Sequence, residues 1–362
     1  MHSEAPRGLA LTARSIHPAT DLCTLALLAQ SGELTSSRDD ALSLTGDAQA
    51  RLASLAGERP AGYWSGLLRC AQVLALLKHE ARHWAVIDPD SEMLGATQSE
   101  CFPALMAVWL SQPPWLTSLM TQSGITDEPK SSTPMSMALL QFLGVFEAGV
   151  WYPLSSLHVM VSAVAERNGL SAVPEVFSRL LFDQVYLVLG ACELGSDNTS
   201  FRVRPGLALP PISFLDQPLK CELTERLTPR CRADAYRALI ARKLNANTAW
   251  TQVSEELARF REERRSRNAS DGCLQIISGL KPRVATSPQI PFRDCLYLAQ
   301  FGRLVPPSDK LQGTYVFELD RNVLPTSEHQ KKELSGFLQE RCCRASQSSV
   351  RDLFEDTAPA KV

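Results

Sequence analysis

Apolar positions in residues 174–206 are spaced as in a helix and then as in a strand pair. Pro174 and Glu175 are a favourable helix start, and Gly190 is a typical helix end. Apolar residues recur between them at helical spacing, at Phe177, Leu180, Leu181, Val185, Leu187, Val188 and Leu189. The polar turn 195–200 follows, and then Phe201 and Val203 alternate with arginines. The pattern predicts a helix that runs directly into a β-hairpin.

The stretch 64–95 repeats this order with little shared sequence. Apolar spacing predicts helices over about 21–30, 45–56 and 63–79. A short strand containing Trp84 and Val86 and a turn at 88–90 follow the third helix. A further helix is expected over 98–110, ending before Pro113 and Pro114.

Short helices followed by a hairpin are typical of a winged helix, and the chain carries this order twice. We predict a first winged-helix domain over 1–122, the linker 123–134, and a second winged-helix domain over 135–208. A basic helical connector is expected over 219–270, where Trp250, Val253, Leu257 and Phe260 form one apolar stripe.

The pattern of apolar and polar residues changes after Cys273. Short strands are expected at 274–278 and about 281–285, then a helix with Phe292, Leu296 and Ala299 on one face. A strand with Tyr315, Phe317 and Leu319 on one face and two closing helices follow. We predict a small α+β domain over 271–362, which makes the whole chain mainly α with small β content, an α+β fold.

The composition is that of a globular protein: of the 362 residues, 44% are hydrophobic and 21% are charged. No apolar run reaches the roughly 20 residues that span a bilayer, and residues 1–15 lack the pattern of a signal peptide. The ten cysteines are scattered and form no C-x-x-C spacing, which favours free thiols. We therefore expect a cytoplasmic protein with no membrane partner.

Charge is unevenly distributed. Residues 1–218 carry 13 basic and 21 acidic side chains, whereas 219–270 carry 12 basic and 7 acidic. A polyanion would favour the middle segment, while the acidic N-terminal part argues against strong, purely electrostatic DNA binding. Both indications stand.

Several stretches together resemble a known family. Leu298-Ala299-Gln300-Phe301 and Tyr315-Val316-Phe317-Glu318 stand where the N-terminal domain of XPB-type DNA repair helicases has its "LA-F" and "YR-T"-like motifs. The stretches 76–90 and 107–115 are similar to winged-helix-like repeats of bacterial helicase-associated proteins. The chain departs from the pattern at 323–330, where the usual glycine is missing. The resemblance implies DNA-associated work beside a helicase or in defence against foreign DNA, with no catalytic residues.

Winged helices place one helix in the DNA major groove and wing residues on the backbone. The candidate DNA-binding residues are therefore basic side chains of the two helix–hairpin stretches and of the connector. They are Arg69, Lys78, Arg82, Arg179, Arg202, Arg204, Arg264 and Arg265. Strand alternation sends Arg202 and Arg204 to one face. The alternatives are arginines on a solvated strand, and a connector whose arginines belong to a solvated amphipathic helix.

One motif suggests an enzyme. His79-Glu80-Ala81-Arg82-His83 satisfies H-E-x-x-H, which on a helix lets two imidazoles hold zinc while Glu80 activates water. The alternative is that this text ends a helix and begins a wing. Arg82 beside the metal and the absence of a supporting third-ligand motif favour the second interpretation.

No Gly-Lys pair and no G-x-S-x-G elbow occur, so neither a phosphate-binding motor loop nor a hydrolase signature is present. Our first hypothesis is a non-enzymatic, cofactor-free subunit of a DNA-processing or anti-phage defence complex that works with a separate helicase or nuclease. The second is a protein–protein adaptor that never contacts DNA, and the third is the zinc metallopeptidase. DNA is thus a possible partner and another protein subunit an expected one.

Overall fold

A computed structural model describes residues 11–14, 16–37, 40–87, 98–127, 129, 132–170 and 172–206. It also describes shorter stretches at 255, 258–259, 272–277, 282–287, 290, 292–305, 315–319, 327–342, 350 and 353. The chain divides into two compact units. The first comprises Met1–Pro18, Arg59–Ala75 and Gln98–Phe260, and the second comprises Ala19–Glu58, Leu76–Thr97 and Arg261–Val362. Helices with small antiparallel sheets make a mixed α+β fold, as the sequence predicts.

The described part of the first unit is a helical assembly with a small sheet. Its helices are α3 (Tyr63–Val73), α4 (Gln98–Ser111), α5 (Pro113–Gln122), α6 (Ser132–Gln141), α7 (Leu154–Arg167), α8 (Glu175–Leu181) and α9 (Leu187–Leu189). A 3-10 turn, η2 (Phe142–Val145), follows α6. Strands β3 (Tyr152–Pro153), β4 (Cys192–Leu194) and β5 (Ser200–Val203) form an antiparallel sheet in the order β3-β5-β4.

The predicted helix and hairpin over 174–206 are confirmed. Helix α8 continues through a π-helical turn, η3 (Phe182–Tyr186), into α9, and Gly190 ends it in the left-handed conformation at φ 73°. Strands β4 and β5 then pair Cys192 with Val203 and Leu194 with Phe201. Every residue of η3 is buried, so this helix carries core on all sides of its middle turn.

Helix α3 packs against η3 within the first unit. Gly66 of α3 lies against the backbone of Gln184, and a Cβ built on Gly66 would stand 2.3 Å from the Gln184 carbonyl oxygen. Leu67, Leu68 and Cys70 of the same helix are fully buried. The absence of a side chain at Gly66 is therefore what permits this close approach.

The N-terminal segment extends the small sheet. The Arg14 amide donates to the Leu194 carbonyl at 2.8 Å, and the Ser196 amide donates to the Thr12 carbonyl at 3.0 Å. These bonds cover the outer edge of β4, which would otherwise expose unpaired backbone groups.

The N-terminal part of the second unit contains two helices and a hairpin. Helices α1 (Pro18–Gln30, whose first residue is assigned to the first unit) and α2 (Gly46–Ala56) precede strands β1 (Leu77–Glu80) and β2 (His83–Val86). Thr35, between the helices, bridges to His83, and the Trp84 amide donates to the Leu34 carbonyl at 3.1 Å. Trp84 is buried, and its indole Nε1 donates to the Ala41 carbonyl at 3.2 Å. The hairpin is thus held by the strand-like segment that joins α1 to α2.

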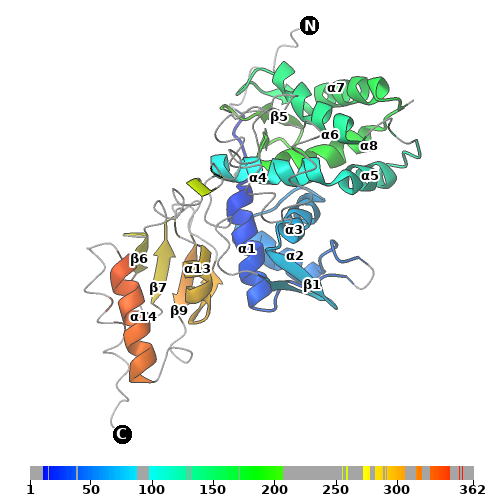
Figure 1. The fold of residues 1–362 in the computed structure, drawn as a ribbon. Coiled ribbons are helices and arrows are strands. Elements are labelled where there is room, and N and C mark those ends of the chain that lie inside the picture. Colours follow the sequence, from blue (N-terminus) through cyan, green and yellow to red (C-terminus); the bar gives the residue numbers. More distant parts are fainter. Residues whose placement is uncertain are drawn as a thin grey trace. The chain divides into compact units, whose positions relative to one another are not determined.

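The C-terminal part of the second unit contains a four-stranded antiparallel sheet in the order β6-β7-β9-β8. Its strands are β6 (Leu274–Ile277), β7 (Arg283–Thr286), β8 (Gly302–Val305) and β9 (Val316–Leu319). Helices α13 (Phe292–Ala299) and α14 (Glu328–Arg341) lie beside this sheet (Figure 1). Arg341 Nε bonds Asp294 Oδ2 at 2.8 Å, and the rings of Tyr297 and Phe337 lie 4.5 Å apart, which joins the two helices.

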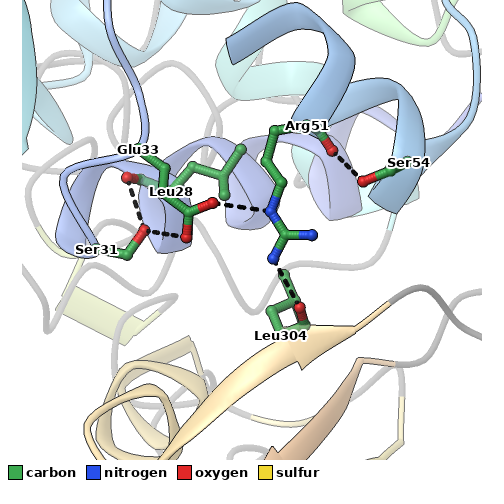
Figure 2. A network of polar contacts seen from close by, with 6 residues as sticks. All are labelled: Leu28, Ser31, Glu33, Arg51, Ser54 and Leu304. Carbon is green, nitrogen blue, oxygen red and sulfur yellow. Dashed lines mark hydrogen bonds and ion pairs between the residues drawn. The ribbon is translucent and has the colours of Figure 1, made fainter. Parts of the chain in front are cut away.

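A polar network joins α1 and α2 to the C-terminal sheet within the second unit (Figure 2). Arg51 of α2 donates through Nε to Glu33 Oε2 at 2.8 Å and through Nη2 to the Leu304 carbonyl of β8 at 3.0 Å. Ser31 holds the other oxygen of Glu33 at 3.1 Å. Only 16% of the Arg51 side chain is exposed, so both bonds are partly shielded from water.

We expect Arg51→Ala to lower the free energy of unfolding by about 1–2 kcal/mol, because a charged donor is lost from a half-buried carbonyl. Glu33→Gln should cost less than about 1 kcal/mol, since the Glu33 side chain is 41% exposed and its ion pair is screened. Urea denaturation of the full chain measures both. Equal losses for the two variants would show that the ion pair, and not the Leu304 bond, carries the effect.

One expectation about secondary structure is wrong, and two elements were not predicted. The helix predicted over 63–79 ends at Val73, where Leu74 closes it and Ala75 turns to φ 56°, and Leu77–Glu80 is a strand. The helix expected over 98–110 is confirmed as α4 and ends before Pro113. Helix α5, which begins at Pro113, was not predicted, although the missing N–H and fixed φ of proline suit the first helical turn. Strand β8 was not predicted, since only Leu304 and Val305 follow Gly302 and Arg303 as apolar residues.

The predicted domain ranges coincide only in part with the two compact units. The range 1–122 is divided between the two units, and 135–208 lies within the first. The connector 219–270 lies almost entirely outside the described residues, and 271–362 belongs to the second unit.

Candidate functional site

The first unit contains a cleft of about 610 Å³ beside the β4–β5 turn. Three segments line it: the start of α7, the exposed side of α8, and the turn itself. The lining residues are Pro153, Leu154, Ser155, Leu157, His158, Glu175, Val176, Ser178, Arg179, Asn198 and Thr199. A volume of this size lies within the range of ordinary ligand and peptide pockets.

Arg179 fixes one wall of the cleft. Its Nε donates to Asp183 Oδ2 at 3.0 Å, one helical turn further along, and its Nη1 donates to the Asn198 carbonyl at 3.3 Å. The guanidinium thus ties α8 to the hairpin turn while 38% of the side chain stays exposed. Two of its five N–H donors are engaged by these described residues.

The opposite wall is the beginning of α7. The Leu154 amide donates to the Thr199 carbonyl at 2.8 Å, which connects α7 to the same turn. Pro153, at the N-cap of α7, offers no side-chain cap to the first-turn amides. His158 Nδ1 and Ser178 Oγ lie 3.0 Å apart and join α7 to α8.

Asp183 is buried behind Arg179, with 3% of the residue exposed. Desolvation raises the pKa of its carboxyl to about 6 from an ordinary value of 3.8, although the charge and hydrogen bond of Arg179 act in the opposite direction. Its Oδ1 has no hydrogen-bond partner among the described residues. The neutral form is therefore favoured in the folded chain relative to the unfolded one.

This shift predicts a pH dependence of stability. Because the folded pKa lies above the unfolded one, the cost of the buried charge is present above pH 6 and disappears as the pH falls toward 3.8. Relative to Asp183→Asn, the unmodified chain should gain about 2 kcal/mol of unfolding free energy between pH 7 and pH 4. Urea denaturation of both proteins across this range measures the difference. A difference that does not change with pH would contradict a buried, titrating Asp183.

Arg202 and Arg204, the leading DNA-binding candidates, lie on the face opposite the buried Phe201 and Val203, as predicted. Both interact with one carboxylate on the neighbouring strand. Arg202 Nε lies 2.5 Å from Glu193 Oε2, and Arg204 Nε lies 3.4 Å from Glu193 Oε1. Arg202 also stacks over the Trp151 ring at 4.7 Å. Their charges are thus partly neutralised within the chain.

The remaining candidates are dispersed. Arg69 of α3 donates to Ser118 Oγ at 3.3 Å and lies over the Trp115 ring at 5.8 Å. Lys78 pairs with Glu80 at 2.6 Å, and Arg82 is exposed in the β1–β2 turn of the second unit. Arg264 and Arg265 lie outside the described residues. Of the six candidates that the structure describes, only Arg179 lines the cleft.

The H-E-x-x-H segment is not helical. His79 and Glu80 are in β1 and His83 is in β2, with Glu80 opposite His83 across a two-residue turn. His79 Nε2 lies 2.6 Å from Ser36 Oγ. The shared helix face that the zinc interpretation requires is therefore not formed. Within the described ranges, no three His, Cys, Asp or Glu side chains are grouped to hold a metal ion.

Sequence reasoning missed most of the cleft. Arg179 and Asp183 stand four residues apart on a helix, a spacing that signals an ion pair. The contact of His158 with Ser178, twenty residues away, leaves no local signal in the sequence. None of the described helices is long and apolar enough to cross a bilayer.

No family model, no curated protein and no solved structure matches this chain.

Proposed function

We propose that this chain is a non-enzymatic adaptor subunit that binds partner proteins through two winged-helix modules. The element order supports the assignment of the modules. In the second stretch, α6, β3, α7, the α8–α9 helix, β4 and β5 follow one another, and β3 pairs with β5. In the first stretch, α1, α2, α3, β1 and β2 follow in order and Thr35 pairs with β2, although α3 belongs to the first unit and the other four elements to the second.

The packing of α3 against η3 carries the choice between DNA and protein. A winged helix that reads DNA inserts its third helix into the major groove, so one face of that helix must be free. Here the third helix of the first stretch and the middle of the third helix of the second stretch bury each other's surface. An adaptor requires no free third helix.

The ion pairs of the candidate arginines also favour protein binding over DNA binding. Phosphate contacts supply most of the affinity of a DNA-binding protein. Arg202 and Arg204 share Glu193, and Arg179 pairs with Asp183. To bind a phosphate, each arginine would have to break or share its ion pair with a carboxylate of the same chain. The resemblance to helicase-associated proteins suggests that the partner belongs to a DNA-processing or defence assembly.

A DNA titration tests this proposal. The full chain should bind a mixed-sequence duplex weakly or not at all between 50 and 200 mM salt, and Arg202→Ala/Arg204→Ala should change nothing. Arg283→Ala/Arg303→Ala, in the C-terminal sheet, is the matched control. Tight binding with a steep salt slope that falls by about 2 only in the first double variant would favour a DNA-binding subunit.

The positive test is isolation of the native complex after nuclease digestion. An adaptor should retain a stoichiometric protein partner when all nucleic acid has been removed. Recovery of the chain alone, or of a partner that is lost with the nucleic acid, would contradict the proposal.

A further inference from the structure

We draw no further inference here: the strongest candidate, the surface of α7 and α8 that exposes Val159 and Val176, is an apolar helix face, and nothing in the structure shows what covers it.

Discussion

Replacing Gly66 by alanine should lower the free energy of unfolding of the first unit by about 3 kcal/mol. Alanine normally stabilises a helix interior by about 1 kcal/mol relative to glycine. At Gly66 the new Cβ would lie 2.3 Å from the Gln184 carbonyl oxygen and 3.0 Å from its Cα, and neither backbone atom can rotate away. Overpacking of this kind typically costs 1–3 kcal/mol and sometimes more, so the steric cost exceeds the helical gain.

Gly336 of α14 is the matched control. A Cβ there would meet no atom within 4 Å, so Gly336→Ala should stabilise by about 0.5–1 kcal/mol. Urea denaturation of the full chain, monitored by tryptophan fluorescence and circular dichroism, measures both variants. Stabilisation by Gly66→Ala similar to that of Gly336→Ala would mean that α3 does not lie against Gln184.

Truncation of Phe201 to alanine should cost about 3–5 kcal/mol, because it empties the centre of an aromatic cluster. Phe201 is fully buried on the central strand β5. Its ring lies 5.1 Å from that of Phe146, 5.8 Å from Phe182 and 6.1 Å from Tyr152, measured between centroids. These rings join the sheet to η3 and to the segment after α6.

Phe201→Leu separates the loss of volume from the loss of the ring. Leucine should retain most of the burial and cost roughly 1–2 kcal/mol, since only the aromatic contacts and a small volume are removed. The same denaturation series provides the comparison. An alanine variant within about 1 kcal/mol of the unmodified chain would contradict a buried Phe201 and with it the register of the hairpin.

The elements with strong local signals could be predicted from the sequence. Pro174, Gly190 and the alternation at 201–204 predict the α8–α9 helix and the hairpin because start, stop and strand signals act over a few residues. Helix α2 was predicted over 45–56 from its apolar spacing, which is also a local signal, and Thr45 caps it. The strand at 316–319, with Tyr315, Phe317 and Leu319 buried, is a third example.

The features that decide function depend on contacts between distant segments. Gly66 and Gln184 meet although 118 residues separate them, and nothing near Gly66 signals a partner. Arg202 and Arg204 were placed on the correct face, yet their shared partner Glu193 is known only once the hairpin register is fixed. The H-E-x-x-H text matched a helical motif, but a hairpin forms there because Thr35 and Leu34 pair with its second strand.

Amide hydrogen exchange of the full chain tests most directly whether the third helices are unavailable to DNA. If α3 and η3 bury each other, the amides of 63–73 and 182–189 should exchange only with global unfolding of the first unit, and duplex DNA should leave their rates unchanged. Fast local exchange in these segments, or protection that appears only when DNA is added, would contradict the account.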